Sequence, residues 1–262
     1  MKIILLLSFI CLFSLPITGQ DNYFCTPCGS TCDQIAFDAP GLCNHCNMDL
    51  IPRSETEQQE AIHQRNQGRK RILFYLHEGI EVLDWAGPAE AFTSAGFEVI
   101  TASVDGLPIT SQGVFRIEPM YSIHNAPEAD ILAFFGGNSG HASNNKEVIT
   151  WLKERFAQTE IIFSVCTGAF FLAKAGLLDH QVATTFHDSI EDLRKLVPKA
   201  KIIEGVKYVD NGKIITAAGV SSGIHGALYL IKRLMGKERA LATAEYMEYE
   251  NWKGDGYVVK EK

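Results

Sequence analysis

The sequence lacks any cluster of lysine and arginine residues. It contains 24 Lys and Arg against 31 Asp and Glu, which gives a formal net charge of −7 at pH 7. Because neutralising the phosphates of a nucleic acid needs clustered cations, this distribution argues against a nucleic-acid partner. Internal repeats are absent as well, and the 46% of apolar and 21% of charged residues are those of an ordinary globular protein.

The sequence has little that could span a membrane. The apolar run at residues 3–15 is too short to cross a bilayer comfortably; it follows the positive charge of Lys2 and is broken by Pro16. With small residues near a cleavage point at 18–20, this is the pattern of a secretory signal peptide. We therefore expect residues 1–20 to be removed and the mature protein to be periplasmic or secreted, with no stable membrane span. An uncleaved anchor is the alternative.

Cysteine is scarce over most of the chain. Of seven cysteines, one lies in the predicted signal peptide, one is Cys166, and five fall within residues 25–46. Those five are Cys25, Cys28, Cys32, Cys43 and Cys46. Two Cys-x2-Cys pairs separated by a short loop have the spacing that places four thiolates around zinc or another soft heavy metal. A segment this short and poor in apolar residues is expected to need a metal or crosslinks to fold.

Residues 21–52 resemble the heavy-metal-binding ribbon near the front of some bacterial metal-handling proteins. The resemblance rests on residues 23–28 and 40–50, and it implies that the ligands are Cys25, Cys28, Cys43 and Cys46, with Cys32 or His45 as substitutes or additions. This chain carries Asn47 where the family usually has Gly. The alternative is a unit stapled by disulfides, because the predicted compartment is oxidising, although five cysteines would leave one thiol over. A bound metal could be purely structural, and we assign no catalysis to it.

A change of pattern separates two parts of the chain. Residues 53–70 are polar and almost devoid of large apolar side chains, which indicates a solvated linker. From residue 71 onward, short apolar runs typical of buried parallel strands alternate with amphipathic, helix-like stretches. The expected strands are 71–76, 97–101, 130–135 and 161–165, and the expected helices are 88–95, 146–157 and 168–178.

The same stretch ends with a hairpin signal. The runs 206–209 and 213–216 flank Asp210, Asn211 and Gly212, which favour a tight turn. Alternating strands and helices predict an α/β fold with a doubly wound, mainly parallel sheet and an antiparallel element added. In such sheets the active site forms beyond the carboxyl ends of the strands.

Cys166 stands where a buried strand is expected to turn into a helix. It follows Val165 and precedes Thr167 and Gly168, which are small enough for a sharp, strained turn. A thiol at a helix N-terminus experiences the partial positive charge of unpaired N–H groups, which favours the thiolate and can stabilise an oxyanion. The residues thus predict a cysteine nucleophile, and the alternative is a buried structural cysteine.

Residues 71–252 resemble the ThiJ/PfpI superfamily, which is related to the class I glutamine amidotransferases. Among its branches, the isonitrile hydratases and the amidase-like domains of AraC-type regulators are the most similar. The matching blocks are 83–92, 135–138, 166–168, 175–178, 183–185, 218–224 and 247–249. The resemblance implies a flavodoxin-like sandwich with Cys166 on a nucleophile elbow, followed by a tail at 253–262.

The resemblance assigns further site residues. An acidic residue of the first loop contacts the thiol in this branch, and Asp84 occupies its place as an acid/base; the alternative for Asp84 is a helix N-cap. Thr167 would offer its backbone N–H. The opposing wall of the pocket would be Gly136, Gly137 and Asn138, with Gly168 in the elbow. The plain alternative for the two wall glycines is a tight turn after a strand.

Three departures from the family pattern narrow the range of activities expected for this chain. Protease-like members carry His directly after the nucleophile, whereas this chain has Thr167, which puts peptidase activity in doubt. His187 follows a predicted strand and is a candidate base, or else the first residue of a helix. His225 stands where hydratase relatives carry Asp. The DNA-binding helices of the regulators are not expected, since little sequence follows Trp252.

Taken together, the sequence predicts an exported, cysteine-dependent hydratase or hydrolase acting on a small molecule in the manner of isonitrile hydratase. We expect a homodimer, a metal in the ribbon, and no cofactor in the α/β domain. Two alternatives are open: a non-catalytic redox or metal sensor, and a metal-handling protein in which the α/β domain is a scaffold.

Overall fold

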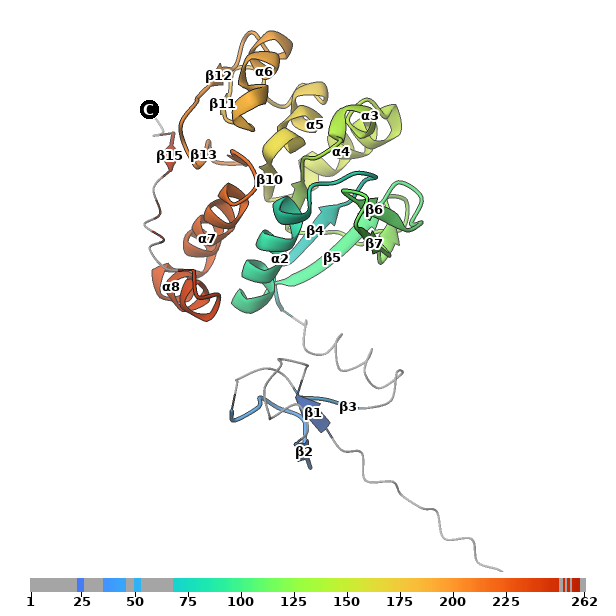
Figure 1. The fold of residues 1–262 in the computed structure, drawn as a ribbon, viewed down its shortest axis with the longest axis vertical. Coiled ribbons are helices and arrows are strands. Elements are labelled where there is room, and N and C mark those ends of the chain that lie inside the picture. Colours follow the sequence, from blue (N-terminus) through green and yellow to red (C-terminus); the bar gives the residue numbers. More distant parts are fainter. Residues whose placement is uncertain are drawn as a thin grey trace, which may run out of the picture. The chain divides into compact units, whose positions relative to one another are not determined.

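The computed structural model describes residues 23–25, 35–45, 50–52, 68–249, 252, 254 and 256–259 of the 262-residue chain. The chain divides into two compact units, residues 1–67 and 68–262, shown in Figure 1. The predicted signal peptide, most of the predicted linker, and Cys28, Cys32 and Cys46 lie outside the described residues. In the part that is described, no helix is long and apolar enough to cross a membrane.

The first unit holds a small antiparallel sheet in the order β2–β1–β3, formed by β1 (Tyr23–Cys25), β2 (Ala36–Phe37) and β3 (Leu50–Pro52). Cys25 pairs with Leu50 in this sheet, and the Leu50 N–H donates to the Gly41 carbonyl at 2.8 Å. Gly41 lies two residues before Cys43, whose side chain is buried. The backbone therefore draws the segments of two predicted metal ligands toward the same strand.

The second unit is built on an eight-stranded sheet in the order β15–β13–β14–β10–β9–β4–β5–β8. All neighbours in it are parallel except β13 and β14, which form the predicted hairpin. Its strands are β4 (Arg71–Tyr75), β5 (Glu98–Ser103), β8 (Tyr121–Ser122), β9 (Ile131–Phe134), β10 (Ile161–Val165), β13 (Tyr208–Asp210), β14 (Ile214–Ala217) and β15 (Tyr257–Val258). The predicted α/β class with a mainly parallel sheet is confirmed.

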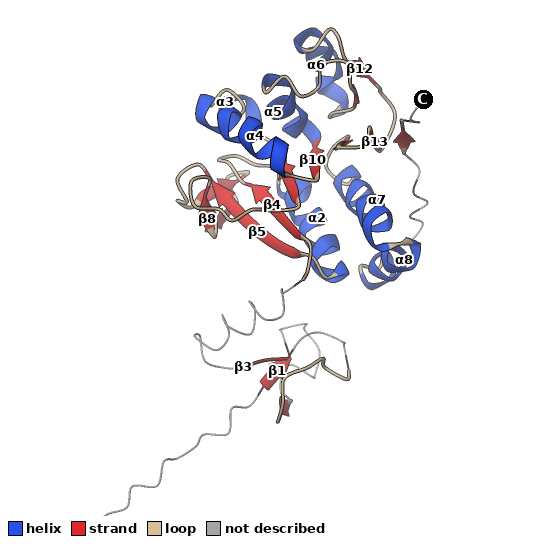
Figure 2. Cartoon of the chain, turned by 180° about the vertical axis from the view of Figure 1, so that it is seen from behind, coloured by secondary structure: helices blue, strands red, loops and turns tan. Residues whose placement is uncertain are grey.

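Helices cover both faces of the sheet (Figures 1 and 2). One face packs against α2 (Val82–Ala95), α7 (Ser222–Met235) and α8 (Lys237–Tyr246), and the other against α4 (Lys146–Gln158), α5 (Ala169–Lys174) and α6 (Ile190–Leu196). Alternation along β4 explains how one strand serves both layers: Ile72 and Phe74 enter the first core, whereas Leu73 and Tyr75 enter the second. Strands buried on both faces read as continuous apolar runs, which is why the sequence revealed them.

Smaller elements complete the second unit. They are α3 (Ser139–Ala142), the 3₁₀ turns η2 (Cys166–Gly168) and η3 (His187–Ser189), the hairpin of β6 (Ile109–Ser111) with β7 (Phe115–Ile117), and the parallel pair β11 (Val182–Ala183) and β12 (Lys201–Ile202). The structure corrects two predicted boundaries. α2 begins six residues before the expected residue 88, and the helix expected to reach residue 178 stops at Lys174, shortly before Gly176 takes a φ of 74°.

Candidate active site

Cys166 lies directly after β10 and begins η2. Its φ of 60° is left-handed, a conformation that strains a residue with a Cβ and that marks a nucleophile elbow. Its neighbours in the sheet, β9 and β14, run parallel to β10, so all three carboxyl ends meet at one edge. The loops that follow these strands meet there, and sites in α/β sheets form beyond the carboxyl ends of the strands.

Two backbone N–H groups surround the sulfur of Cys166. Thr167 supplies one and Gly137, after β9, supplies the other, and both hydrogen bonds act to lower the pKa of the thiol. Such a pair of fixed donors is suited to stabilise negative charge that develops on or next to the sulfur. Thr167, Gly137 and Cys166 are therefore brought together by the fold.

Asp84 is fully buried and lies next to the Cys166 thiol. Its Oδ2 accepts from the Gly136 N–H at 2.9 Å, its Oδ1 accepts from the Val220 N–H at 2.8 Å, and it is hydrogen-bonded to the Cys166 thiol. It lies in the first turn of α2 rather than in the expected loop. The helix N-cap is Glu81, so the alternative reading of Asp84 as the cap is wrong.

The pKa values of the pair are shifted in the same direction. Burial raises the pKa of Asp84 to about 6, against the opposing effect of its hydrogen bonds. Burial, followed by the negative charge of Asp84, raises the pKa of Cys166 to about 12. The expectation that the helix turn would favour a thiolate is therefore wrong for this arrangement, because desolvation and Asp84 outweigh the two N–H groups. Burial therefore disfavours the state in which Asp84 and Cys166 are both negatively charged.

Close packing requires glycine at two predicted positions. A Cβ on Gly136 would lie 2.7 Å from the Cys166 Cβ and 2.7 Å from the Thr167 backbone nitrogen. A Cβ on Gly168 would lie 2.3 Å from the Phe134 carbonyl oxygen, so the elbow packs directly on β9. Both glycines allow a backbone approach that any larger residue would block.

The remaining predicted residues lie farther out. The Thr167 hydroxyl accepts from Ser139 at 2.7 Å, which ties the elbow to α3. Asn138 is exposed, and its backbone N–H donates to the Gly79 carbonyl at 2.9 Å. His187 is exposed and its Nδ1 lies 2.8 Å from Asp188 Oδ1. No hydrogen bond in the described part of the chain joins His187 to Cys166 or Asp84, so the fold does not assemble these three.

Two residues that received no role from the sequence belong to this site. Val220 has a φ of 50°, which is rare for a β-branched residue, and in that conformation it directs its N–H at Asp84. The buried Thr185 hydroxyl donates to the Cys166 carbonyl at 2.7 Å and so anchors the elbow from the loop after β11. Neither role has a local sequence signature, because both depend on contacts between distant loops.

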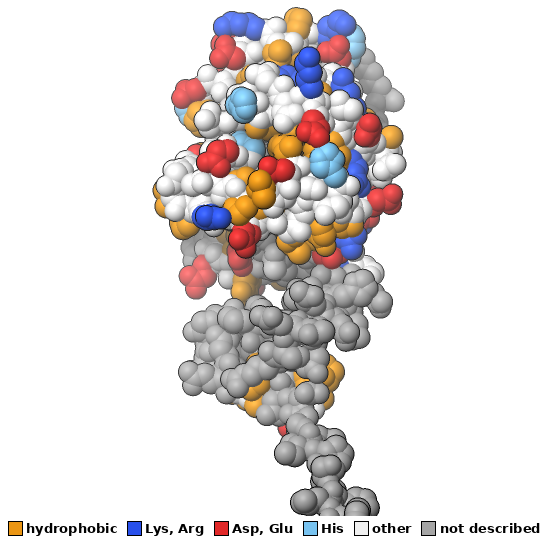
Figure 3. Space-filling view, turned by 90° about the vertical axis from the view of Figure 1, so that its right-hand side faces the viewer, with side chains coloured by type: hydrophobic (Ala, Val, Ile, Leu, Met, Phe, Trp, Pro, Cys, Tyr) orange, Lys and Arg blue, Asp and Glu red, His pale blue; other side chains and the backbone are white. Residues whose placement is uncertain are grey.

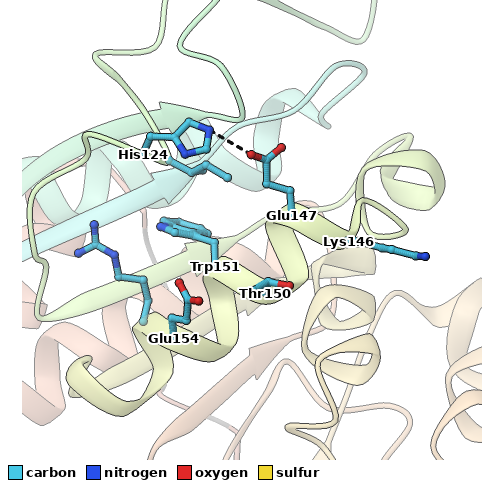
Figure 4. Close-up of a pocket in the computed structure, with 8 residues that line it drawn as sticks. His124, Lys146, Glu147, Thr150, Trp151 and Glu154 are labelled. Carbon is cyan, nitrogen blue, oxygen red and sulfur yellow. Dashed lines mark ion pairs between the residues drawn. The ribbon is translucent and has the colours of Figure 1, made fainter.

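Two of the cavities in the described part of the second unit differ in whether they contain predicted site residues. The larger, about 640 Å³, is an open groove on α4 that contains the His124–Glu147 ion pair at 3.1 Å and no predicted site residue (Figure 4). The smaller, about 210 Å³, includes His187 and Thr185 in its wall and thus lies beside the elbow. Among the described residues, no group of three His, Cys, Asp or Glu side chains gathers as a metal site.

The thiol chemistry and backbone of the first unit fit a soft metal. Of the five predicted ligands, the structure describes the backbone of Cys25 and the buried side chain of Cys43. Their segments meet at Leu50, and so small a sheet has little apolar core of its own. The exposed His45 has its side chain on the surface beside Cys43.

Comparison with known proteins matches both units. Residues 70–233 match the DJ-1/PfpI family, and residues 22–53 match the heavy metal binding domain. The isonitrile hydratase of Pseudomonas putida is 28% identical over 184 residues, covering 68% of this chain and 78% of that protein. The HTH-type transcriptional regulator GbdR of Pseudomonas aeruginosa is 26% identical over 193 residues, covering 71% of this chain but about half, 52%, of the regulator.

Solved structures agree with this grouping. A ThiJ/PfpI family protein from Pseudomonas syringae has a TM-score of 0.66 and 27% identity, covering 70% of this chain and 76% of that one. DJ-1beta from Drosophila melanogaster has a TM-score of 0.62 at 21% identity, covering 69% of this chain and 98% of its own, and shows a likeness of fold alone. Because the family match spans more than half of the sequence, the chain belongs to the DJ-1/PfpI family.

Proposed function

We propose that this protein is a cysteine-dependent hydratase for small molecules with a reactive carbon–nitrogen bond, isonitriles above all. The observation that carries the proposal is the buried pair of Cys166 and Asp84, held between the N–H groups of Thr167 and Gly137. The likeness to an isonitrile hydratase over 78% of that protein's length supports the substrate class. Thr167 in the place of a histidine speaks against peptide hydrolysis.

The ionisation of the pair suggests how the steps run. The Asp84 carboxylate takes the thiol proton as Cys166 Sγ bonds to the terminal isonitrile carbon, and then passes that proton to the carbon. The product of this half is a thioimidate, Cys–S–CH=N–R. Water adds across its C=N bond, the C–S bond breaks, and the thiol regains a proton while an N-substituted formamide leaves. One water is consumed, and the N–H groups of Thr167 and Gly137 stabilise charge near the sulfur in both halves.

The test is turnover by the purified full chain. We expect formamide production from an alkyl isonitrile, and loss of it to the background rate in Cys166→Ser. Cys43→Ser is the matched control, because it replaces a thiol in the other unit and is expected to leave turnover intact. Full turnover in Cys166→Ser would contradict the proposal, as would the absence of turnover on isonitrile, amide and reactive-carbonyl substrates by a folded protein.

The buried thiol bears on the alternative of a redox sensor. Oxidation to sulfenic acid proceeds through the thiolate, and burial together with the negative charge of Asp84 raises the pKa of Cys166, which opposes that form. A redox-sensing role is therefore the weaker candidate. Measuring the peroxide sensitivity of Cys166 at neutral pH tests this, and rapid sulfinate formation without turnover would favour the sensor.

The first unit is proposed to bind zinc or another soft heavy metal through Cys25, Cys28, Cys43 and Cys46, with Cys32 as a further donor. When bound, the metal would supply folding energy to this unit rather than chemistry to Cys166. Export to the periplasm or exterior is proposed from the N-terminal pattern alone. Metal analysis of the purified protein and N-terminal sequencing of the mature protein test the two points.

We also propose that the second unit forms a homodimer. Val114 and Phe115 on the β6–β7 hairpin are 70% and 53% exposed, and Met120 nearby is 58% exposed. Figure 3 looks onto the side where this hairpin lies and shows apolar side chains gathered between charged ones. Covering them with a second copy would remove apolar surface from water. Sedimentation of the wild type and of Phe115→Ser tests this, and a wild-type monomer would contradict it.

A further inference from the structure

The side chain of Phe186 lies close to the Cys166 sulfur, and its two neighbours in the sequence line the smaller cavity. One point in space, where a Cβ on Gly219 would sit, is 2.8 Å from Phe186 Cδ2 and 3.3 Å from Cys166 Sγ. The ring of Phe186 thus meets the Gly219 backbone immediately next to the sulfur. The cavity is lined by the residues on either side of this contact, Thr185 and His187 from one loop and Ala218 from the other.

The cavity has an uncharged interior and a charged mouth. Thr184, Thr185, Ile190 and Ser222 are buried and form its floor. His187, Glu204 and Lys207 also line it but are exposed. At about 210 Å³ it is smaller than the usual ligand pocket of about 300–1,000 Å³. A charged group on the floor would lose its hydration without a partner, so the interior suits a compact, uncharged group.

The sulfur needs such an opening. Cys166 is only 6% exposed, and its backbone is fixed by the elbow and by the Thr185 hydrogen bond. Phe186 is half-buried and packs with its ring 4.3 Å from that of His187, centroid to centroid, just before η3. A half-buried ring at the start of a short 3₁₀ turn can change its rotamer with less disruption than the strand ends around it.

We propose that this cavity is the subsite for the non-reacting part of the substrate, and that Phe186 determines which substituents reach it. The substrate class is then an isonitrile or related C–N compound with a compact, uncharged substituent. In this proposal a passage leads from the cavity to Cys166 Sγ, and the ring of Phe186 closes it in the present arrangement. A bound substituent lies against this ring, with the reactive carbon at Cys166 Sγ. The substrate class in this inference rests on the proposed function. The existence of the passage does not.

The experiment measures access to the thiol and selectivity separately. The full-length wild type, Phe186→Ala and Phe186→Leu are treated with iodoacetamide and with the bulkier N-benzylmaleimide, and alkylation of the peptide containing Cys166 is followed by mass spectrometry. Phe156→Ala is the matched control, because Phe156 is also half-buried but lies on α4. We expect Phe186→Ala to raise the rate with the maleimide by about tenfold relative to the rate with iodoacetamide. The control should show no change in this ratio.

Turnover of a size series of isonitriles gives the second readout. Phe186→Ala should shift kcat/KM toward larger substituents, and Ala218→Leu, which fills the cavity, should shift it toward smaller ones. Equal alkylation ratios in the wild type and both Phe186 variants, with folded protein, would overturn the passage. A changed alkylation ratio with no isonitrile turnover by any variant would overturn the proposed function while leaving the passage in place. Phe186→Leu keeps an apolar side chain, so it serves to test the passage if Phe186→Ala fails to fold.

Discussion

The two units use cysteine in opposite ways. In the α/β unit, a single thiol at Cys166 is placed by the packing of β9, β10 and β14, and its pKa follows from burial and from Asp84. In the N-terminal unit, five cysteines lie within residues 25–46 of the sequence, and the strands that the structure describes there are very short. In one unit the fold determines the chemistry of the thiol, whereas in the other we expect the thiols and a bound metal to determine the fold.

Metal removal should separate the two units most strongly. Structural zinc sites in small domains bind with about 10–16 kcal/mol, so a chelator is expected to unfold the N-terminal unit completely and to leave the α/β unit folded. Amide NMR spectra of the full chain check this. Cys43→Ser should lower the metal affinity, while Cys166→Ser should leave it unchanged. Loss of α/β signals on chelation would show that the units are not independent.

Replacing Asp84 should lower turnover but raise the rate at which Cys166 is alkylated. Asp84→Asn is expected to lower turnover by about 10²–10⁴, because it removes the general base. It should also speed alkylation of Cys166 at fixed pH, by about tenfold for each pKa unit by which removing the negative charge lowers the pKa of the thiol. Glu90→Gln, on the same helix but exposed, is the control. Parallel decreases in both rates would indicate lost folding instead.

The pH dependence of turnover and of stability tests the role of Asp84 in a second way. Because the pKa of Asp84 is raised to about 6, turnover should fall as the pH drops through this value and Asp84 gains a proton. The raised pKa has the reverse effect on stability: the buried carboxyl is favourable when protonated, so the free energy of unfolding should decrease by about 3 kcal/mol as the pH rises from about 4 to about 6. Urea titrations of the wild type and Asp84→Asn measure the difference. Identical pH slopes would contradict it.

The smallest effect concerns the packing that positions the elbow. Gly168→Ala should destabilise the α/β unit by about 1–3 kcal/mol, because its Cβ would overlap the Phe134 carbonyl, which is part of β9. Gly140→Ala is the control, since nothing lies within 4 Å of its Cβ position. The N-terminal unit should be unaffected by both. Equal urea midpoints for the two variants would show that β9 yields at little cost.

The sequence predicted those features that arise locally. β4, β9 and β10 are apolar on both faces, and Asn211 with Gly212 signals the hairpin, so these elements could be located in advance. The elbow at Cys166 likewise follows from a strand that meets small residues. α7 escaped prediction although it is largely buried, because small residues such as Gly223 and Gly226 fit between neighbouring elements and interrupt the apolar pattern.

Other parts of the site could not be predicted from the sequence because they are set by contacts between distant loops. The raised pKa of the Cys166 thiol depends on the depth of burial and on Asp84, 82 positions earlier in the chain. The exposure of His187 depends on how η3 lies at the surface. Local sequence motifs identify the residue types. The direction of a pKa shift depends on burial, nearby charges and hydrogen bonds that oppose one another and are known only from the structure.

The left-handed backbone of Val220 links the carboxylate of Asp84 to the conformation of the loop before α7. Such a conformation costs about 1–3 kcal/mol and persists only where its surroundings hold it, and the hydrogen bond from the Val220 N–H to Asp84 is one such restraint. In the proposed reaction Asp84 takes up a proton, which weakens this restraint, so we expect the loop before α7 to relax once in each cycle. The position of this loop would then depend on the protonation state of Asp84.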